Sequence, residues 1–139
     1  MYLLTLSIVS IFLLLSLLHF SWAMGGSWGF EASIPKTTDG EWVMKPKKTD
    51  SAIVGLGLLL FAIFYLIRAD HIPFELPPWA VNIAEWLIPS IFLFRAIGDF
   101  KYVGFFKKVK TTEFARNDSN FFSPLCIVIA LIGFIIGII

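Results

Sequence analysis

Residues 2–23 read YLLTLSIVSIFLLLSLLHFSWA, an apolar run that contains no Lys, Arg, Asp or Glu. A helix of about 20 predominantly apolar residues spans the hydrocarbon core of a bilayer. The run is longer than the apolar core of a secretory signal peptide, and it lacks the positively charged segment that precedes such a core. We therefore predict a first membrane-spanning helix over residues 2–23.

Three further segments have the same apolar character. Residues 51–67 are uncharged and follow Asp50, whose carboxylate suits the N-cap of a helix. Residues 80–100 follow a proline-rich stretch, which predicts a turn because prolines do not continue a helix. Residues 123–139 begin at Ser123-Pro124, a pair typical of a helix start. The sequence thus predicts an all-α, four-helix integral membrane bundle that forms a single domain over residues 1–139.

The composition agrees with this fold and excludes several classes of protein. Hydrophobic residues make up 58% of the 139 residues and charged residues 15%, which is unlike a water-soluble globule or a disordered chain. A net charge of +1 gives no electrostatic footprint for nucleic acid. The single cysteine, Cys126, excludes an internal disulfide. No His, Cys, Asp or Glu cluster has metal-ligand spacing, so we expect neither a metal nor a cofactor.

The basic residues are divided unequally between the two ends of the predicted helices. Arg68 alone lies in the loop between the second and third helices. Loops that carry an excess of Lys and Arg face the cytoplasm, so we expect the first and third loops there and both termini outside. These two loops hold Lys36, Lys45, Lys47, Lys48, Lys101, Lys107, Lys108, Lys110 and Arg116.

Two shorter patterns predict further packing. Apolar residues from Tyr102 to Val109 recur at helical spacing with lysines beside them, which predicts a short amphipathic helix at the inner interface. Gly133 and Gly137 form a GxxxG pattern, which allows a second helix to approach closely. This close approach can occur within the bundle, or it can serve a homodimer or another membrane protein.

Polar and aromatic side chains gather at one predicted membrane depth, near the cytoplasmic ends of the first and third helices. Within each helix the spacing places pairs on one face: His19 with Trp22, and Arg95 with Asp99. We expect an ion pair between Arg95 and Asp99. The ligand-binding candidates are His19, Trp22, Trp28, Glu31, Arg95, Asp99 and Lys101.

These residues leave more than one function open. An arginine in an apolar helix is costly, so the Arg95–Asp99 pair either locks the bundle or leaves guanidinium donors free for an anionic or carbonyl group. His19 carries an imidazole, which can donate or accept a proton, and is a weak candidate for a general acid or base, although such a histidine is more often structural. The first hypothesis is the binding or processing of an amphiphilic molecule, of lipid or quinone type, in a polar pocket at the cytoplasmic leaflet. The second is a structural or regulatory membrane subunit without catalysis. A transporter ranks last, because its ionisable groups would lie near the bilayer midplane.

Several of these segments resemble a known family. The resemblance covers nearly the whole chain and is most specific in the block from Arg95 to Lys107. The chain is similar to small bacterial membrane proteins grouped as domain of unknown function 3995, which implies a four-helix protein of the bacterial inner membrane. No activity is assigned to that family, so no catalytic residue carries over. The other matching segments are His19–Gly29, Glu31-Ala32, Ile34-Pro35, Phe114–Asp118 and Ser123–Cys126.

Overall fold

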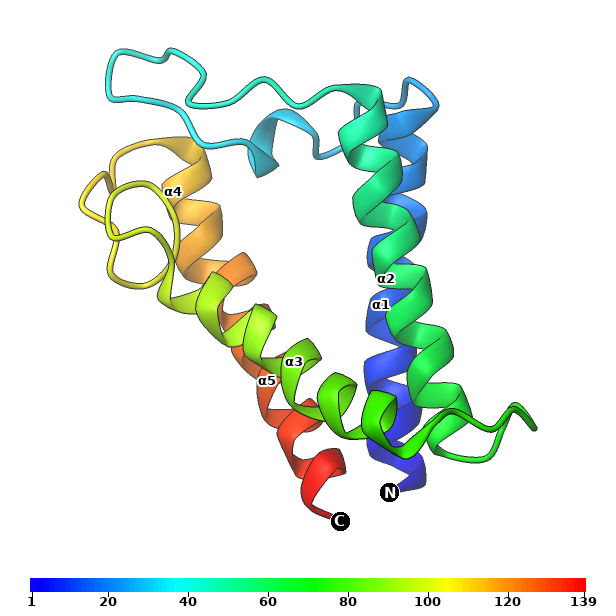
Figure 1. The fold of residues 1–139 in the computed structure, drawn as a ribbon. Helices are drawn as coiled ribbons and strands as arrows, with labels where there is room; N and C mark the ends of the chain where they lie inside the picture. The colour runs from blue at the N-terminus through cyan, green and yellow to red at the C-terminus, as the bar shows by residue number, and fades with distance from the viewer.

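The structure is a computed structural model that describes residues 1–139, and its regular secondary structure is helical apart from one isolated bridge between Lys36 and Trp42 (Figure 1). Four helical segments are long and apolar enough to cross a membrane, which confirms the predicted all-α membrane bundle. In chain order the elements are α1 (Tyr2–Ala23), η1 (Glu31–Ser33), α2 (Lys48–Arg68), α3 (Pro78–Ile97), α4 (Glu113–Asn117), η2 (Asp118–Phe122) and α5 (Ser123–Ile138).

The four long helices form two hairpins that meet at one end only. α1 packs along α2, and α3 packs along α5. The hairpins approach each other near both chain termini, which we call the narrow end, and they diverge toward the opposite, wide end (Figure 1). The loop between α1 and α2 crosses over the wide end, where η1 contacts α4. The molecule therefore has an open V shape, bridged at its wide end by the first loop.

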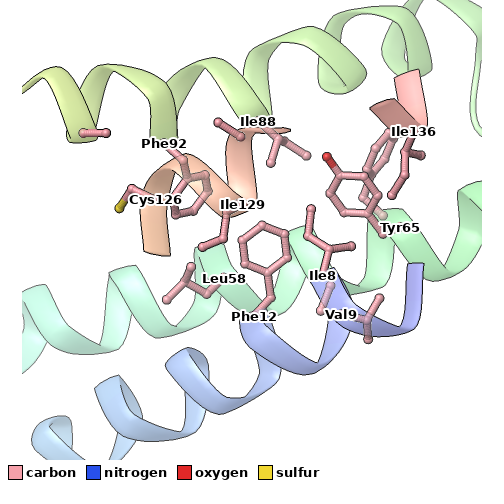
Figure 2. Packing of buried hydrophobic residues seen from close by; sticks show 14 residues of the cluster. Ile8, Val9, Phe12, Leu58, Tyr65, Ile88, Phe92, Cys126, Ile129 and Ile136 are labelled. Atoms are coloured by element: carbon pink, nitrogen blue, oxygen red, sulfur yellow. The ribbon is translucent and has the colours of Figure 1, made fainter. Parts of the chain in front are cut away.

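The two hairpins share one hydrophobic core, to which α1, α2, α3 and α5 all contribute (Figure 2). The ring of Phe12 lies between the hairpins, with centroid distances of 5.7 Å to Phe61 and 5.4 Å to Phe92. Helices in a membrane associate through this kind of close packing, because the lipid tails are as apolar as the side chains themselves.

Gly133 lets α5 approach α3 closely. A Cβ atom at this position would lie 2.8 Å from the Cβ of Pro89 and 2.9 Å from the hydroxyl of Tyr65. A Cβ at Gly137 would lie 3.6 Å from Glu85. The GxxxG face is therefore packed against neighbours within this chain.

An ion pair also ties the hairpins together at the narrow end. The Arg68 guanidinium at the end of α2 donates a hydrogen bond to the carboxylate of Glu85 on α3. Glu85 is 8% exposed, so its charge depends on Arg68 for compensation.

Helix α2 begins three residues earlier than expected. Asp50 is not the N-cap; it lies in the first turn, where its Oδ2 accepts a hydrogen bond from the Lys47 N–H at 2.7 Å. A carboxylate in this place still satisfies a free backbone donor and interacts well with the helix dipole. Asp50 thus supports the start of α2 from inside the helix.

The fourth span begins before Ser123. Thr112 caps α4 by accepting a hydrogen bond from the Ala115 N–H at 3.1 Å, and the chain stays helical through the π turn η2 into α5. The continuous helical segment is Glu113–Ile138, 26 residues, whereas α5 alone has 16. The π turn therefore gives the last helix enough length to cross a bilayer.

The predicted amphipathic helix in the third loop is wrong, because residues 101–112 are irregular. Asp99 Oδ1 accepts hydrogen bonds from the N–H groups of residues 101, 102 and 103, at 2.8–3.0 Å. Gly98 and Gly104 have positive φ and lie so close that a Cβ on Gly98 would collide with the Val103 carbonyl. The loop is thus folded back on itself, and Lys107, one of the lysines beside the predicted amphipathic stripe, is 2% exposed.

Candidate functional site

A cavity of about 580 Å³ lies between the two hairpins, on the wide side of the shared core. Its wall includes residues from all four spanning segments and from the first loop. Phe92 and Ile129 belong both to this wall and to the core, so the core closes the cavity toward the narrow end. The volume lies within the range of small-molecule binding sites in proteins.

The polar side chains of the lining gather at the loop end of the cavity. Toward the core the wall consists of Leu15, Val54, Phe92, Leu125 and Ile129. Toward the loops apolar residues such as Phe30, Ile34 and Met44 are joined by the polar and charged side chains His19, Ser33, Lys45, Asp50, Ser51 and Arg95. A molecule with an apolar tail and a polar head would match this order.

His19 lines the cavity from α1, and one of its ring nitrogens is already engaged. Nδ1 lies 2.8 Å from the carbonyl oxygen of Leu15. A carbonyl can only accept, so Nδ1 carries the proton, and Nε2 is the ring atom left for a bound molecule. The ring packs edge-on against Trp22 at a centroid distance of 4.8 Å. This pair confirms the expected shared face of α1.

Trp22 contributes its ring to the cavity, but not its N–H. Its Nε1 donates a hydrogen bond to the backbone carbonyl of Trp28 at 2.7 Å, and its ring packs against Phe30 at 5.6 Å. Trp28 itself is 81% exposed and does not line the cavity. The segment after α1 therefore fixes the orientation of Trp22 through a backbone group.

Arg95 lies in the cavity wall, and it is not paired with Asp99. Its Nη1 lies 3.0 Å from Oδ1 of Asp118, an ion pair in which the two atoms are not aligned for a hydrogen bond. The expected pairing assumed that α3 continues past residue 99, whereas the helix ends before Gly98, whose φ is +82°. Asp99 therefore turns toward the backbone of the third loop.

Backbone groups of the third loop lower the pKa of the Asp99 carboxyl. Burial acts to raise its pKa, but the hydrogen bonds from the backbone N–H groups of Lys101, Tyr102 and Val103 favour the carboxylate and hold the pKa below its ordinary value. The Asp99 carboxylate thus holds the backbone of the loop that follows α3, and it lies outside the cavity.

Asp118 is the centre of a buried charge network that sequence reasoning missed. Its Oδ2 accepts hydrogen bonds from the Gly104 N–H at 2.7 Å and from Lys107 Nζ at 3.1 Å. Lys107 Nζ also donates to the Gly104 carbonyl at 3.0 Å and to Ser119 Oγ at 2.6 Å. Together with Arg95, these contacts join α3, the third loop and η2. The contacts link residues far apart in the chain, so no local spacing indicated them.

The structure thus brings together three of the seven sequence candidates. His19, Trp22 and Arg95 line the cavity. Glu31 is exposed on η1, and Lys101 is exposed with its Nζ over the ring of Tyr102 at 5.0 Å. Trp28, Glu31, Asp99 and Lys101 all lie outside the cavity wall.

The family described as "Protein of unknown function (DUF3995)" matches residues 12–133 of this chain. The match covers most of the 139 residues, so the chain belongs to this family. No curated protein and no solved structure matches the chain.

Proposed function

We propose that this member of the family binds an amphiphilic molecule, of lipid or quinone type, in the cavity between the hairpins. The observation that carries the proposal is the lining, which is apolar toward the core and gathers its polar and charged side chains toward the loops. The tail would lie against Phe92, Leu125 and Ile129, where burial of apolar surface stabilises it. The head would lie beside His19 and Arg95.

We further propose that the wide end faces the cytoplasm and that the termini lie outside the inner membrane. The first and third loops lie at the wide end and hold nine of the eleven basic residues, which supports this orientation by the positive-inside rule. The cavity would then be at the level of the cytoplasmic leaflet, within reach of molecules that enter from that leaflet.

Quenching of tryptophan fluorescence by brominated amphiphiles tests the binding. Replacement of Trp28, Trp42, Trp79 and Trp86 by Phe leaves Trp22 in the cavity wall as the single tryptophan. In phosphatidylcholine nanodiscs, a dibrominated C18 acid, alcohol or amine should quench Trp22 saturably, and the unbrominated compound should reverse the quenching.

The matched control is the variant that keeps only Trp86, which is 51% exposed on α3 and does not line the cavity. Its quenching should rise in proportion to the amphiphile in the bilayer, without saturation. If the quenching of Trp22 also rises in proportion to the amphiphile, without saturation, for all three compounds, the binding proposal is wrong. The structural or regulatory subunit would then be the better hypothesis.

A further inference from the structure

We infer that the cavity selects an amphiphile whose head is an oxyanion, a carboxylate or a phosphate, and that Arg95 holds this head. The inference rests on the proposed function and names its ligand class. It starts from a charge imbalance: two cations, Arg95 and Lys107, share the single carboxylate of Asp118.

The network of these three side chains is buried at Lys107 and Asp118 and accessible at Arg95. The side chains of Asp118 and Lys107 are 0% and 1% exposed, so both charges are removed from water. The Arg95 side chain is 33% exposed and lies in the cavity wall. One carboxylate against two cations leaves a net charge of +1, and a buried charge without compensation is costly. An anion in the cavity would compensate it at Arg95.

The other charged groups of the cavity wall do not cancel this excess. Lys45 and Asp50 carry one charge of each sign, and the Asp50 carboxylate already accepts the Lys47 N–H. His19, with Nδ1 bound to the Leu15 carbonyl, adds a further polar atom and no negative charge. The polar end of the cavity is therefore positive overall.

Arg95 has the donors that an oxyanion requires. A guanidinium carries five N–H donors in a planar fork that matches a carboxylate or phosphate. The ion pair with Asp118 is made at Nη1, and that atom makes no hydrogen bond within the chain. Asp118 is itself held by the Gly104 N–H and by Lys107, so it acts as a fixed positioning residue for Arg95.

The anion could come from a lipid-like molecule or from a free ion, and the cavity favours the first. The space beside Arg95 continues into the apolar wall formed by Phe92, Leu125 and Ile129. A free phosphate or carboxylate would leave this wall unused, whereas an alkyl chain would gain free energy there.

The quenching assay on Trp22, at about pH 8 and low ionic strength, measures the preference for the head. The brominated acid should bind at least about tenfold more tightly than the alcohol, and the amine should bind most weakly. Arg95→Gln should bring the acid to the affinity of the alcohol. The control Arg116→Gln removes an exposed arginine on α4, outside the cavity wall, and should leave the preference unchanged. Acetate or inorganic phosphate at the same concentration should not displace the acid.

The outcomes separate this inference from the proposed function. Equal affinity of the acid and the alcohol in the parent protein overturns the inference, while saturable quenching still supports the cavity. Displacement of the acid by acetate or phosphate overturns the inference that the bound anion carries an alkyl chain. If Arg95→Gln does not fold, Arg95→Lys keeps a charge beside Asp118 without the planar fork. It should weaken binding of the acid and leave that of the alcohol unchanged, and unaltered acid binding overturns the role of Arg95.

Discussion

At the scale of single residues, Asp118 compensates the charge of the buried Lys107. Asp118→Asn keeps an acceptor for the Gly104 N–H but leaves the ammonium of Lys107 without its carboxylate. Loss of one partner from a buried ion pair costs roughly 3–5 kcal/mol, so the variant should melt at a markedly lower temperature in detergent.

The control is Asp39→Asn, in an exposed turn, which should melt like the parent protein. The double replacement of Asp118 by Asn and Lys107 by Met removes both charges, keeps an acceptor for the Gly104 N–H and should recover most of the stability. A parent-like melting temperature for Asp118→Asn alone would contradict the assigned role of the network.

The residue scale also shows where prediction from sequence stops. His19 and Trp22 lie on one face as predicted, because α1 continues to Ala23 and helical spacing holds for both. The prediction that Arg95 and Asp99 share a helix face and form an ion pair was wrong because the helix ends between them. The partner of Arg95, Asp118, lies in η2, and only the tertiary fold brings the two together.

At the scale of elements, the spans were predictable because the bilayer sets their length and apolar character. The first span, Tyr2–Ala23, has the predicted bounds, the second and third differ by at most three residues at their ends, and the fourth begins ten residues earlier, at Glu113. The third loop was not predictable from periodicity. Its apolar residues have helical spacing, but the Asp99 carboxylate and the contact between Gly98 and Gly104 provide the backbone with another conformation.

The contact of α5 with α3 gives a prediction at this scale. Gly133→Ala places a methyl group 2.8 Å from Pro89 Cβ, on a rigid ring, and 2.9 Å from the hydroxyl of Tyr65. Overpacking of this kind costs about 1–3 kcal/mol, so the variant should melt earlier. Gly57→Ala is the matched control, since a Cβ there meets nothing within 4 Å. Equal melting of the two variants would show that close packing at Gly133 does not stabilise the protein.

At the scale of the whole molecule, the cavity results from how the hairpins pair. Hydropathy predicts which segments span the membrane, but not that α1 pairs with α2 and α3 with α5. The core and the Arg68–Glu85 ion pair close the narrow end, and the first loop covers the wide end. Of the residues predicted at one membrane depth, His19, Trp22 and Arg95 thus come to line a cavity because the hairpins diverge there.

The orientation in the membrane gives the last prediction, and cysteine accessibility tests it. Replacement of the buried Cys126 by Ala provides a background without cysteine, into which Thr38→Cys or Glu75→Cys is introduced. Both positions are exposed, Thr38 in the first loop and Glu75 in the loop between α2 and α3. Since basic loops stay in the cytoplasm, an impermeant maleimide should label only the Glu75→Cys protein in intact cells. Both proteins should react after permeabilisation, which controls for exposure. The reverse pattern in intact cells would place the cavity at the outer leaflet, and any amphiphile would then enter from outside the cell.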